Sequence, residues 1–165
     1  MMAPITGRAV RVMLVAAVLM VSGCGYSTSA LIRDDIHTVY IPVFDNQTWY
    51  RGLEVQLTRA VLEEVKLHSP LRIASRQDAD STLEGELVAF DQGVVTKTVD
   101  EVVVLTNATA KVKFRWVDNL TGRDIVPKQT VVEKVIVAPG AGEAIEANVF
   151  REVAKRILER MEKDW

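Results

Sequence analysis

The single cysteine of the chain, Cys24, is the residue best suited to covalent chemistry. It follows an apolar run, residues 12–21, that Arg8 and Arg11 precede. About ten apolar residues are too few to cross a hydrocarbon core of roughly 30 Å. They match the usual length of the central region of a secretory signal peptide, which is later removed. We therefore predict that this segment directs export and that the cysteine lies at the cleavage site.

The four residues at this site read Val-Ser-Gly-Cys and are similar to a bacterial lipobox, in which the cysteine receives a diacylglycerol and becomes the new N-terminus. The chain then divides into a signal peptide at 1–23, a lipidated tether at 24–35 and a single domain at 36–165. A diacylglycerol and an N-acyl chain on Cys24 would hold the domain on a membrane, because each buried CH₂ contributes about 0.8 kcal/mol. Gly25 follows the cysteine in place of an aspartate, which favours the outer membrane over the inner membrane.

Little else in the sequence could support catalysis. Once Cys24 is acylated no thiol remains, and the two histidines, His37 and His68, lack a metal-binding spacing. No serine lies in a Gly-x-Ser-x-Gly motif. We therefore predict that the protein is not an enzyme and holds no metal, and no cofactor besides its acyl chains. The net charge is −2, and removal of the signal peptide with its two arginines makes it more negative. This negative charge argues against nucleic acid as a partner.

A basic stripe in "KVKFRW" is the most suggestive binding feature. Lys111, Lys113 and Arg115 alternate with apolar residues, so a strand would place the three cations on one face. Such a face could receive phosphates or acidic sugars. The alternative is that Glu84 and Glu86 lie opposite and form ordinary cross-strand ion pairs, and both interpretations stay open.

Trp49 and Tyr50 are candidate partner contacts, because they follow the turn-forming residues of "DNQT" and large exposed aromatics often anchor a partner. The plainer expectation is that they pack against the helix that begins directly after them.

The periodicity of apolar residues predicts the elements that must position these side chains. Residues 37–44 are apolar on both alternating faces, which predicts a buried strand. Residues 51–70 change to a helical spacing, and Pro70 ends that helix. A short strand at 71–75 follows, and residues 145–165 form a second amphipathic pattern at helical spacing.

Two long β segments, 81–99 and 101–118, should form an antiparallel hairpin, and a last strand spans 123–138. In one register the residue numbers of each cross-strand pair sum to 199. Apolar residues then lie opposite apolar residues on one face of the hairpin, and acidic residues lie opposite basic residues on the other. Its pairs are Leu83 with Trp116, Leu87 with Val112, Ala89 with Ala110, Glu84 with Arg115, and Glu86 with Lys113. Pro127 cannot donate to a ladder, so it marks an edge or a bulge.

The predicted fold class is therefore α+β. We expect a two-layer sandwich in which two helices pack on one face of a mostly antiparallel, four-stranded sheet.

Several motifs together resemble the LPS-assembly lipoprotein family LptE. They are "CGY" at the lipobox, the strand "VYIPVFDN", the helix start "GLE", the segment "ADSTLEGEL" and a last helix that ends in "DW". Their order and spacing extend over nearly all of the chain after Cys24.

The resemblance implies a lipid-anchored outer-membrane protein that binds and plugs the β-barrel translocon LptD, assists its folding and helps to insert lipopolysaccharide. It also implies lipopolysaccharide binding through basic residues on or near the sheet, for which Lys111, Lys113 and Arg115 are the candidates from the strand pattern. The alternative is a lipoprotein regulator or scaffold of a periplasmic machine, such as an activator of a peptidoglycan synthase or a secretion accessory protein. A tether of about ten residues would keep the domain close to the membrane, which favours the barrel.

Overall fold

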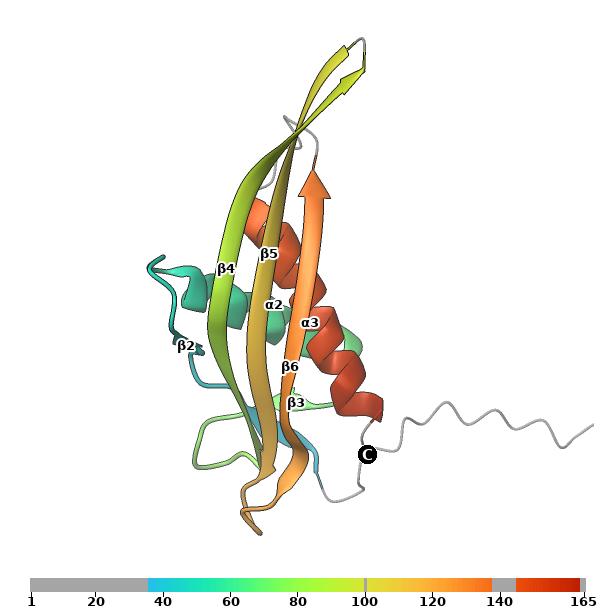
Figure 1. Cartoon of the computed structure of the whole chain (residues 1–165). Helices are drawn as coiled ribbons and strands as arrows, with labels where there is room; N and C mark the ends of the chain where they lie inside the picture. The colour runs from blue at the N-terminus through green and yellow to red at the C-terminus, as the bar shows by residue number, and fades with distance from the viewer. Residues whose placement is uncertain (1–35, 100, 138–144, 164–165) are drawn as a thin grey trace, which may run out of the picture. The chain divides into compact units, whose positions relative to one another are not determined.

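The computed structural model describes residues 36–99, 101–137 and 145–163, with the backbone alone for 94–99 and 101–104. The elements in chain order are β1 (Thr38–Tyr40), β2 (Asp45–Asn46), α2 (Leu53–His68), β3 (Arg72–Ile73), β4 (Ser81–Val99), β5 (Glu101–Asp118), β6 (Asp124–Val137) and α3 (Ile145–Lys163). The two helices, the long hairpin and the last strand lie where the sequence predicts them (Figure 1).

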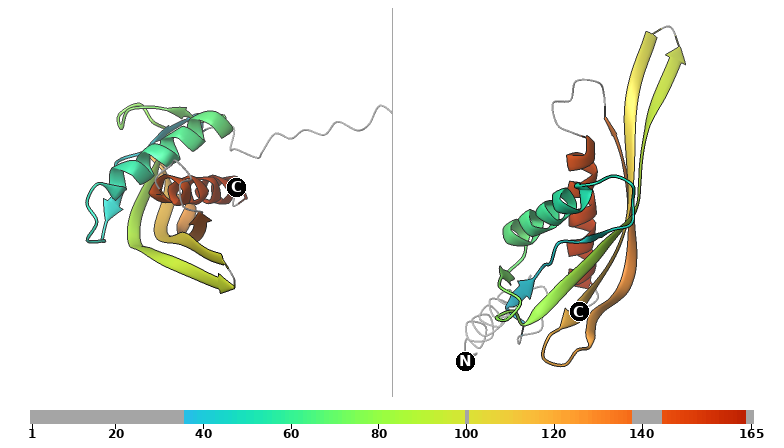
Figure 2. Two further views of the ribbon diagram at one scale, coloured as in Figure 1. Left: turned by 90° about the horizontal axis from the view of Figure 1, so that it is seen from above. Right: turned by 90° about the vertical axis from the view of Figure 1, so that its left-hand side faces the viewer.

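The sheet is mixed and six-stranded, in the order β3-β1-β4-β5-β6, and β2 pairs with β4 beside β1. Both helices lie on the same face of the sheet, as predicted (Figure 2). The expected mostly antiparallel, four-stranded sheet is wrong, because β1 pairs in parallel with β3 and β4, and β2 pairs in parallel with β4. Helix α2 connects β2 to β3 as a crossover. A helical crossover lets the strand that follows it run parallel to its neighbour in the sheet, as β3 does beside β1.

The single strand expected at 37–44 is instead two short strands, with Phe44 between them. The Phe44 backbone N–H donates to the Thr58 hydroxyl of α2 at 2.9 Å. That hydroxyl in turn donates to the Glu54 carbonyl at 2.7 Å. The Phe44 ring fills a notch over Gly85, where a Cβ would lie 2.1 Å from the ring. The strand is interrupted because Phe44 turns into the core.

The hairpin has the predicted register at its open end, where Leu83 lies opposite Trp116 and Leu87 opposite Val112. The predicted pair of Ala89 with Ala110 is wrong. The register shifts after Leu87, so that Ala89 lies opposite Lys111 and Phe90 opposite Ala110. Val88 is the extra residue of a β-bulge. The bulge turns the Phe90 side chain, rather than that of Ala89, toward the core.

Pro127 lies in an edge strand, and the pairing of β5 with β6 is irregular beside it. Both features that the proline predicts are therefore confirmed.

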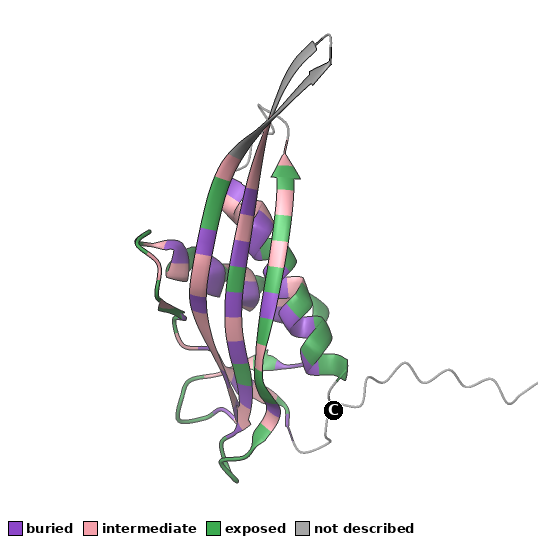
Figure 3. Ribbon diagram, in the orientation of Figure 1, coloured by how far each residue is buried: buried purple, intermediate pink, exposed green. Residues whose placement is uncertain are grey.

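The core lies between the sheet and the two helices (Figure 3). Apolar residues at helical spacing on α2 and α3 meet alternate residues of β4 and β5. The largest fully buried side chains are Trp116, Phe44, Phe114, Phe150, Leu57, Leu83, Leu87, Ile157 and Met161.

Candidate functional site

The basic stripe lies on the sheet face that the helices leave uncovered, which we call the open face. The neighbouring residues of β5, such as Val112 and Phe114, are buried against the helices, so strand alternation turns the cations the other way. Lys113 lies in register between Glu86 of β4 and Thr130 of β6. Lys111, two residues before Lys113 on β5, lies beside Val132 of β6. The three predicted cations therefore share one face.

Arg115 forms the cross-strand ion pair that the hairpin register predicts. Its Nε lies 2.7 Å from Glu84 Oε2, and the two side chains are 47% and 46% exposed. The hydrogen bond to Glu84, followed by the charge of that carboxylate, raises the pKa of Arg115. A pair this exposed contributes little to stability, because water screens it. For Arg115 the interpretation as an ordinary ion pair is confirmed.

Lys113 differs from Arg115, although Glu86 lies opposite it. The Glu86 carboxylate accepts a hydrogen bond from the Gln47 side chain at the edge of the sheet. Within the described part of the chain, no ion pair of 4.0 Å or less joins Lys113 or Lys111 to a carboxylate. Both lysines therefore remain available to an anionic ligand.

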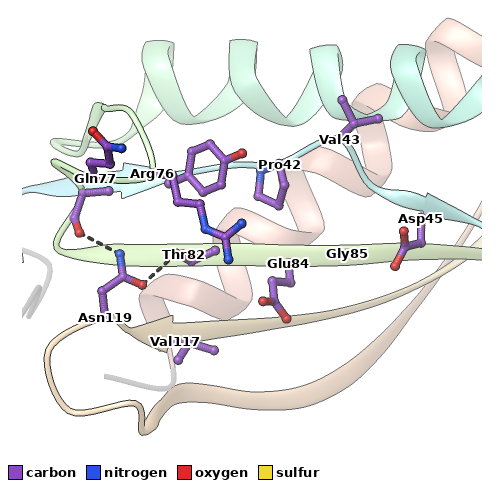
Figure 4. A pocket seen from close by; sticks show the side chains of 12 residues that line it. Pro42, Val43, Asp45, Arg76, Gln77, Thr82, Glu84, Gly85, Val117 and Asn119 are labelled. Carbon is purple, nitrogen blue, oxygen red and sulfur yellow. Dashed lines mark hydrogen bonds between the residues drawn. The ribbon is translucent and has the colours of Figure 1, made fainter.

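A shallow polar cavity of about 740 Å³ adjoins the basic stripe (Figure 4). Thr82 and Glu84 of β4 line its floor, and Figure 4 shows the Arg76 side chain reaching over β4 from the loop before that strand. Asn119 closes one end, where its Oδ1 accepts a hydrogen bond from the Thr82 hydroxyl at 2.7 Å.

A smaller hollow of about 140 Å³ lies beside this cavity and shares Glu84 and Asp45 with it. Lys113, Arg115 and Lys128 line the smaller hollow. The open face therefore presents cations beside the carboxylates of Asp45, Glu84 and Glu86 and beside uncharged hydrogen-bonding groups. Sequence reasoning missed the cavity, because its walls come from segments far apart in the chain.

Trp49 and Tyr50 lie in a loop beside β4, and Trp49 does not pack against α2 as expected. Trp49 is 99% exposed. The Tyr50 ring packs edge to face on Phe90 of β4, with ring centroids 5.6 Å apart and planes at 79°. Phe90 in turn contacts Phe150 of α3, with centroids 5.8 Å apart. Tyr50 is thus fixed on the sheet while Trp49 points into solvent.

Two polar residues build this loop. Asn46 donates to the Tyr50 carbonyl at 2.6 Å and to Glu54 Oε2 at 2.7 Å, and its Oδ1 accepts from the Thr48 N–H at 2.8 Å. The Glu54 carboxylate also accepts from the Gly52 N–H at 3.0 Å. Gly52 has a φ of 87°, which favours glycine. Hydrogen bonds from the backbone of Glu54 and then from Asn46 lower the pKa of Glu54. The motif residues Asn46, Gly52 and Glu54 therefore hold the loop that displays Trp49.

The remaining sequence candidates do not form a reactive site. His68 Nδ1 lies 3.0 Å from Glu64 Oε1 within α2, and His37 is exposed beside β1. In residues 36–99, 101–137 and 145–163, no three His, Cys, Asp or Glu side chains gather closely enough to hold a metal ion. No helix in the same ranges is long and apolar enough to cross a membrane. Cys24 and the segments predicted to be a signal peptide and a tether lie outside the described residues.

Most of the described domain matches a known protein family. Residues 36–161 match the family model described as "LptE: Lipopolysaccharide-assembly". No curated protein sequence gives a significant match to the chain.

Solved structures share the architecture at low sequence identity. A hypothetical protein from Chlamydia trachomatis is 10% identical, with a TM-score of 0.51 over 77% of this chain and 96% of that chain. A protein from Xanthomonas campestris is 9% identical, with a TM-score of 0.50 over 75% of this chain and 82% of that chain. Rare lipoprotein B from Shewanella oneidensis is 15% identical, with a TM-score of 0.43 over 76% and 93%. The first two likenesses show the fold alone.

Proposed function

Because the chain belongs to the lipopolysaccharide-assembly family LptE, we propose that it is a non-catalytic lipoprotein of the outer membrane that takes part in lipopolysaccharide assembly. In this proposal Cys24 carries a diacylglycerol and an N-acyl chain, and residues 24–35 tether the domain to the periplasmic side of the membrane. The protein partner is an LptD-like β-barrel translocon, which the domain plugs and whose folding it assists.

The open face is the part of the domain that we assign to lipopolysaccharide. The observation that carries this assignment is that Lys111 and Lys113 share the face without a carboxylate partner, whereas Arg115 is held by Glu84. Lipopolysaccharide presents phosphates and acidic sugars, which favour cations that are not already neutralised. The polar groups of the adjoining cavity, such as Arg76 and Asn119, would contact sugar hydroxyls.

Charge reversal at the two lysines tests this assignment. The binding of purified lipopolysaccharide to the detergent-solubilised, full-length protein is measured for the wild type and for the Lys111→Glu, Lys113→Glu double variant. We expect the affinity to fall by about tenfold or more, which corresponds to about 1.4 kcal/mol. The wild-type affinity should also fall as salt is added, because the lysines are exposed enough to be screened.

Two comparisons make this test specific. The Lys66→Glu, Lys163→Glu variant carries the same charge change on exposed helix positions, and its affinity should stay close to the wild type. Arg115→Gln should weaken binding less than the double variant, because Glu84 already neutralises Arg115. Unchanged affinity in a folded Lys111→Glu, Lys113→Glu variant would contradict the assignment.

The partner is tested by affinity purification of the tagged protein from solubilised outer membranes, with mass spectrometry of the co-eluting proteins. A stoichiometric large β-barrel is the expected result. A peptidoglycan synthase or a secretion component in its place would move the function to a regulator of that machine.

A further inference from the structure

Among the described strands, none pairs with one side of β4 over more than half of its length. On the side away from β5, β4 pairs with β1 at Ser81 and Thr82 and with β2 at Glu86 and Leu87. The last contact on this side is the Gln47 N–H, which donates to the Leu87 carbonyl at 2.9 Å. From Val88 to Val99, no strand among the described residues pairs with this side of β4. The outward backbone groups of this segment, which we call the β4 edge, need hydrogen-bond partners.

The opposite edge of the sheet, on β6, is protected against strand pairing. It carries Pro127, which cannot donate to a neighbouring strand, and Lys128 and Lys134 are exposed there. Arg156 of α3 also reaches Glu133 of β6, with Nε 2.9 Å from Oε1. Residues 88–90 and 92–96 of the β4 edge include neither a proline nor a charge.

The loop that displays Trp49 lies where the β4 edge begins. Tyr50 packs on Phe90, two residues beyond the bulge at Val88, and Asn46 and Glu54 fix the loop backbone. A fully exposed tryptophan on an ordered loop suits an interface anchor, because little freedom remains to be lost on binding. The anchor and the open backbone therefore form one continuous surface.

The chemistry of this surface selects its occupant. Open backbone N–H and C=O groups are satisfied by another extended chain, which a lipid tail cannot provide. The β4 edge carries one acid, Asp91, and one base, Lys97, so its charge balance is neutral. An extended segment with alternating apolar residues would therefore complement it through backbone hydrogen bonds.

We infer that the β4 edge is a docking site at which an extended segment of the barrel partner adds as a further strand, with Trp49 as its side-chain anchor. This inference rests on the proposed function for the identity of the partner. It adds the contact mode, strand addition, and the chemistry of the partner segment.

Hydrogen exchange tests the inference on the full-length, lipidated protein, alone and in complex with its co-purified barrel. Backbone amides of the peptides that cover residues 88–99 should exchange at least about tenfold more slowly in the complex, because a new strand would bond the outward groups. Peptides of β6, residues 124–137, are the control and should change little. Trp49→Ala should weaken the complex by about thirtyfold, as expected for a buried aromatic anchor. Leu120→Ala removes a side chain that is 94% exposed at the β5–β6 turn, and it should have no effect.

Each other outcome overturns a defined part of the argument. A stable complex without protection of residues 88–99 would overturn strand addition and leave the barrel partnership intact. The amides of residues 88–99 that face β5 are protected in either state, because they pair with that strand. Protection of the outward-facing amides already present in the isolated protein would show that this chain or a second copy covers the edge, which also overturns the inference. Failure to form any barrel complex would overturn the proposed function and, with it, the partner named here.

Discussion

The contact between the Phe44 ring and Gly85 decides where the first strand of the sheet is interrupted. The Phe44 ring enters the core only because Gly85, directly beneath it on β4, has no side chain. Thr58 compensates for the interrupted strand by accepting the Phe44 N–H. Both Phe44 and Gly85 belong to the motifs that resemble the LptE family, and both have structural roles.

Gly85→Ala should therefore destabilise the domain by about 1–3 kcal/mol, the usual cost of overpacking a core. Its Cβ would meet the rigid Phe44 ring at 2.1 Å. Gly93→Ala on the same strand is the matched control, because its Cβ would meet only the end of the Asn107 side chain, at 2.8 Å. Urea unfolding of both variants measures the difference. Equal stability of the two variants would mean that the notch is not needed.

Asp80 connects the loop before β4 to β1. Its Oδ2 accepts from the Thr38 hydroxyl at 2.7 Å and from the His37 and Thr38 N–H groups at 2.9 Å each. The hydrogen bond from the Thr38 side chain, followed by that from the His37 backbone, lowers the pKa of Asp80 from its usual 3.8.

This shift predicts a dependence of stability on acid. A carboxyl whose pKa is lower in the folded protein stabilises it fully above the unfolded-state pKa and loses that effect as the pH falls through the folded-state pKa. The melting temperature of Asp80→Asn should lie below that of the wild type at pH 7, and the gap should narrow below about pH 4. Asp124→Asn, at an exposed site on β6, is the control. A gap that stayed constant down to pH 2 would contradict this role of Asp80.

At the scale of elements, the bulge in β4 lets two strands pair although their buried residues are spaced differently. On β5 the buried residues alternate strictly from Ala108 to Trp116. On β4, Leu87 and Phe90 are both buried although they are three residues apart. One extra residue between them, Val88, lets both face the helices.

Deletion of Val88 should therefore be tolerated better than deletion of a residue from β5. Without Val88, Leu87, Ala89 and Phe90 would lie opposite Val112, Lys111 and Ala110 in unbroken alternation. Deletion of Lys111 would instead turn every later core residue of β5 to the wrong face. Thermal melting and amide NMR spectra compare the two deletions. An unfolded Val88 deletion beside a folded Lys111 deletion would contradict the register argument.

At the scale of the whole molecule, the domain offers several surfaces to its surroundings. Two helices cover one face of the sheet (Figure 1). Strand alternation places the cations of β5 on the other face, and the Trp49 loop adjoins the β4 edge through the contact of Tyr50 with Phe90. A lipid anchor at Cys24 would hold all of these surfaces near a membrane. A barrel and an anionic lipid could then be contacted by one molecule.

Replacement of the anchor is the test at this scale. Cys24→Ala should abolish acyl labelling and release a folded domain from the membrane fraction, because the lipid chains supply the membrane affinity. Labelling with a radioactive fatty acid and cell fractionation measure the two effects. Ser27→Ala, which leaves the lipobox intact, is the control. Persistent labelling of Cys24→Ala would contradict the anchor assignment.

The sequence by itself determined the features that depend on local periodicity and on neighbouring strands. These are the α+β class, both helices, the pairs from Leu83–Trp116 to Leu87–Val112, the edge position of Pro127 and the shared face of Lys111, Lys113 and Arg115. Strand alternation and cross-strand charge pairing suffice for them, because each involves residues close in the chain or joined by one turn. The motifs also sufficed to indicate the family.

Only the tertiary structure decided the parallel pairing of β1, β2 and β3, the break of the first strand at Phe44 and the bulge at Val88. It also decided which cation is neutralised, since Gln47 reaches Glu86 from the loop after β2. It assembled the polar cavity and exposed Trp49. Each of these features depends on how a ring or a side chain from a distant segment fits its neighbours. Such steric fits leave no periodic signal in one sequence, because the residues that make contact are separated by tens of positions along the chain.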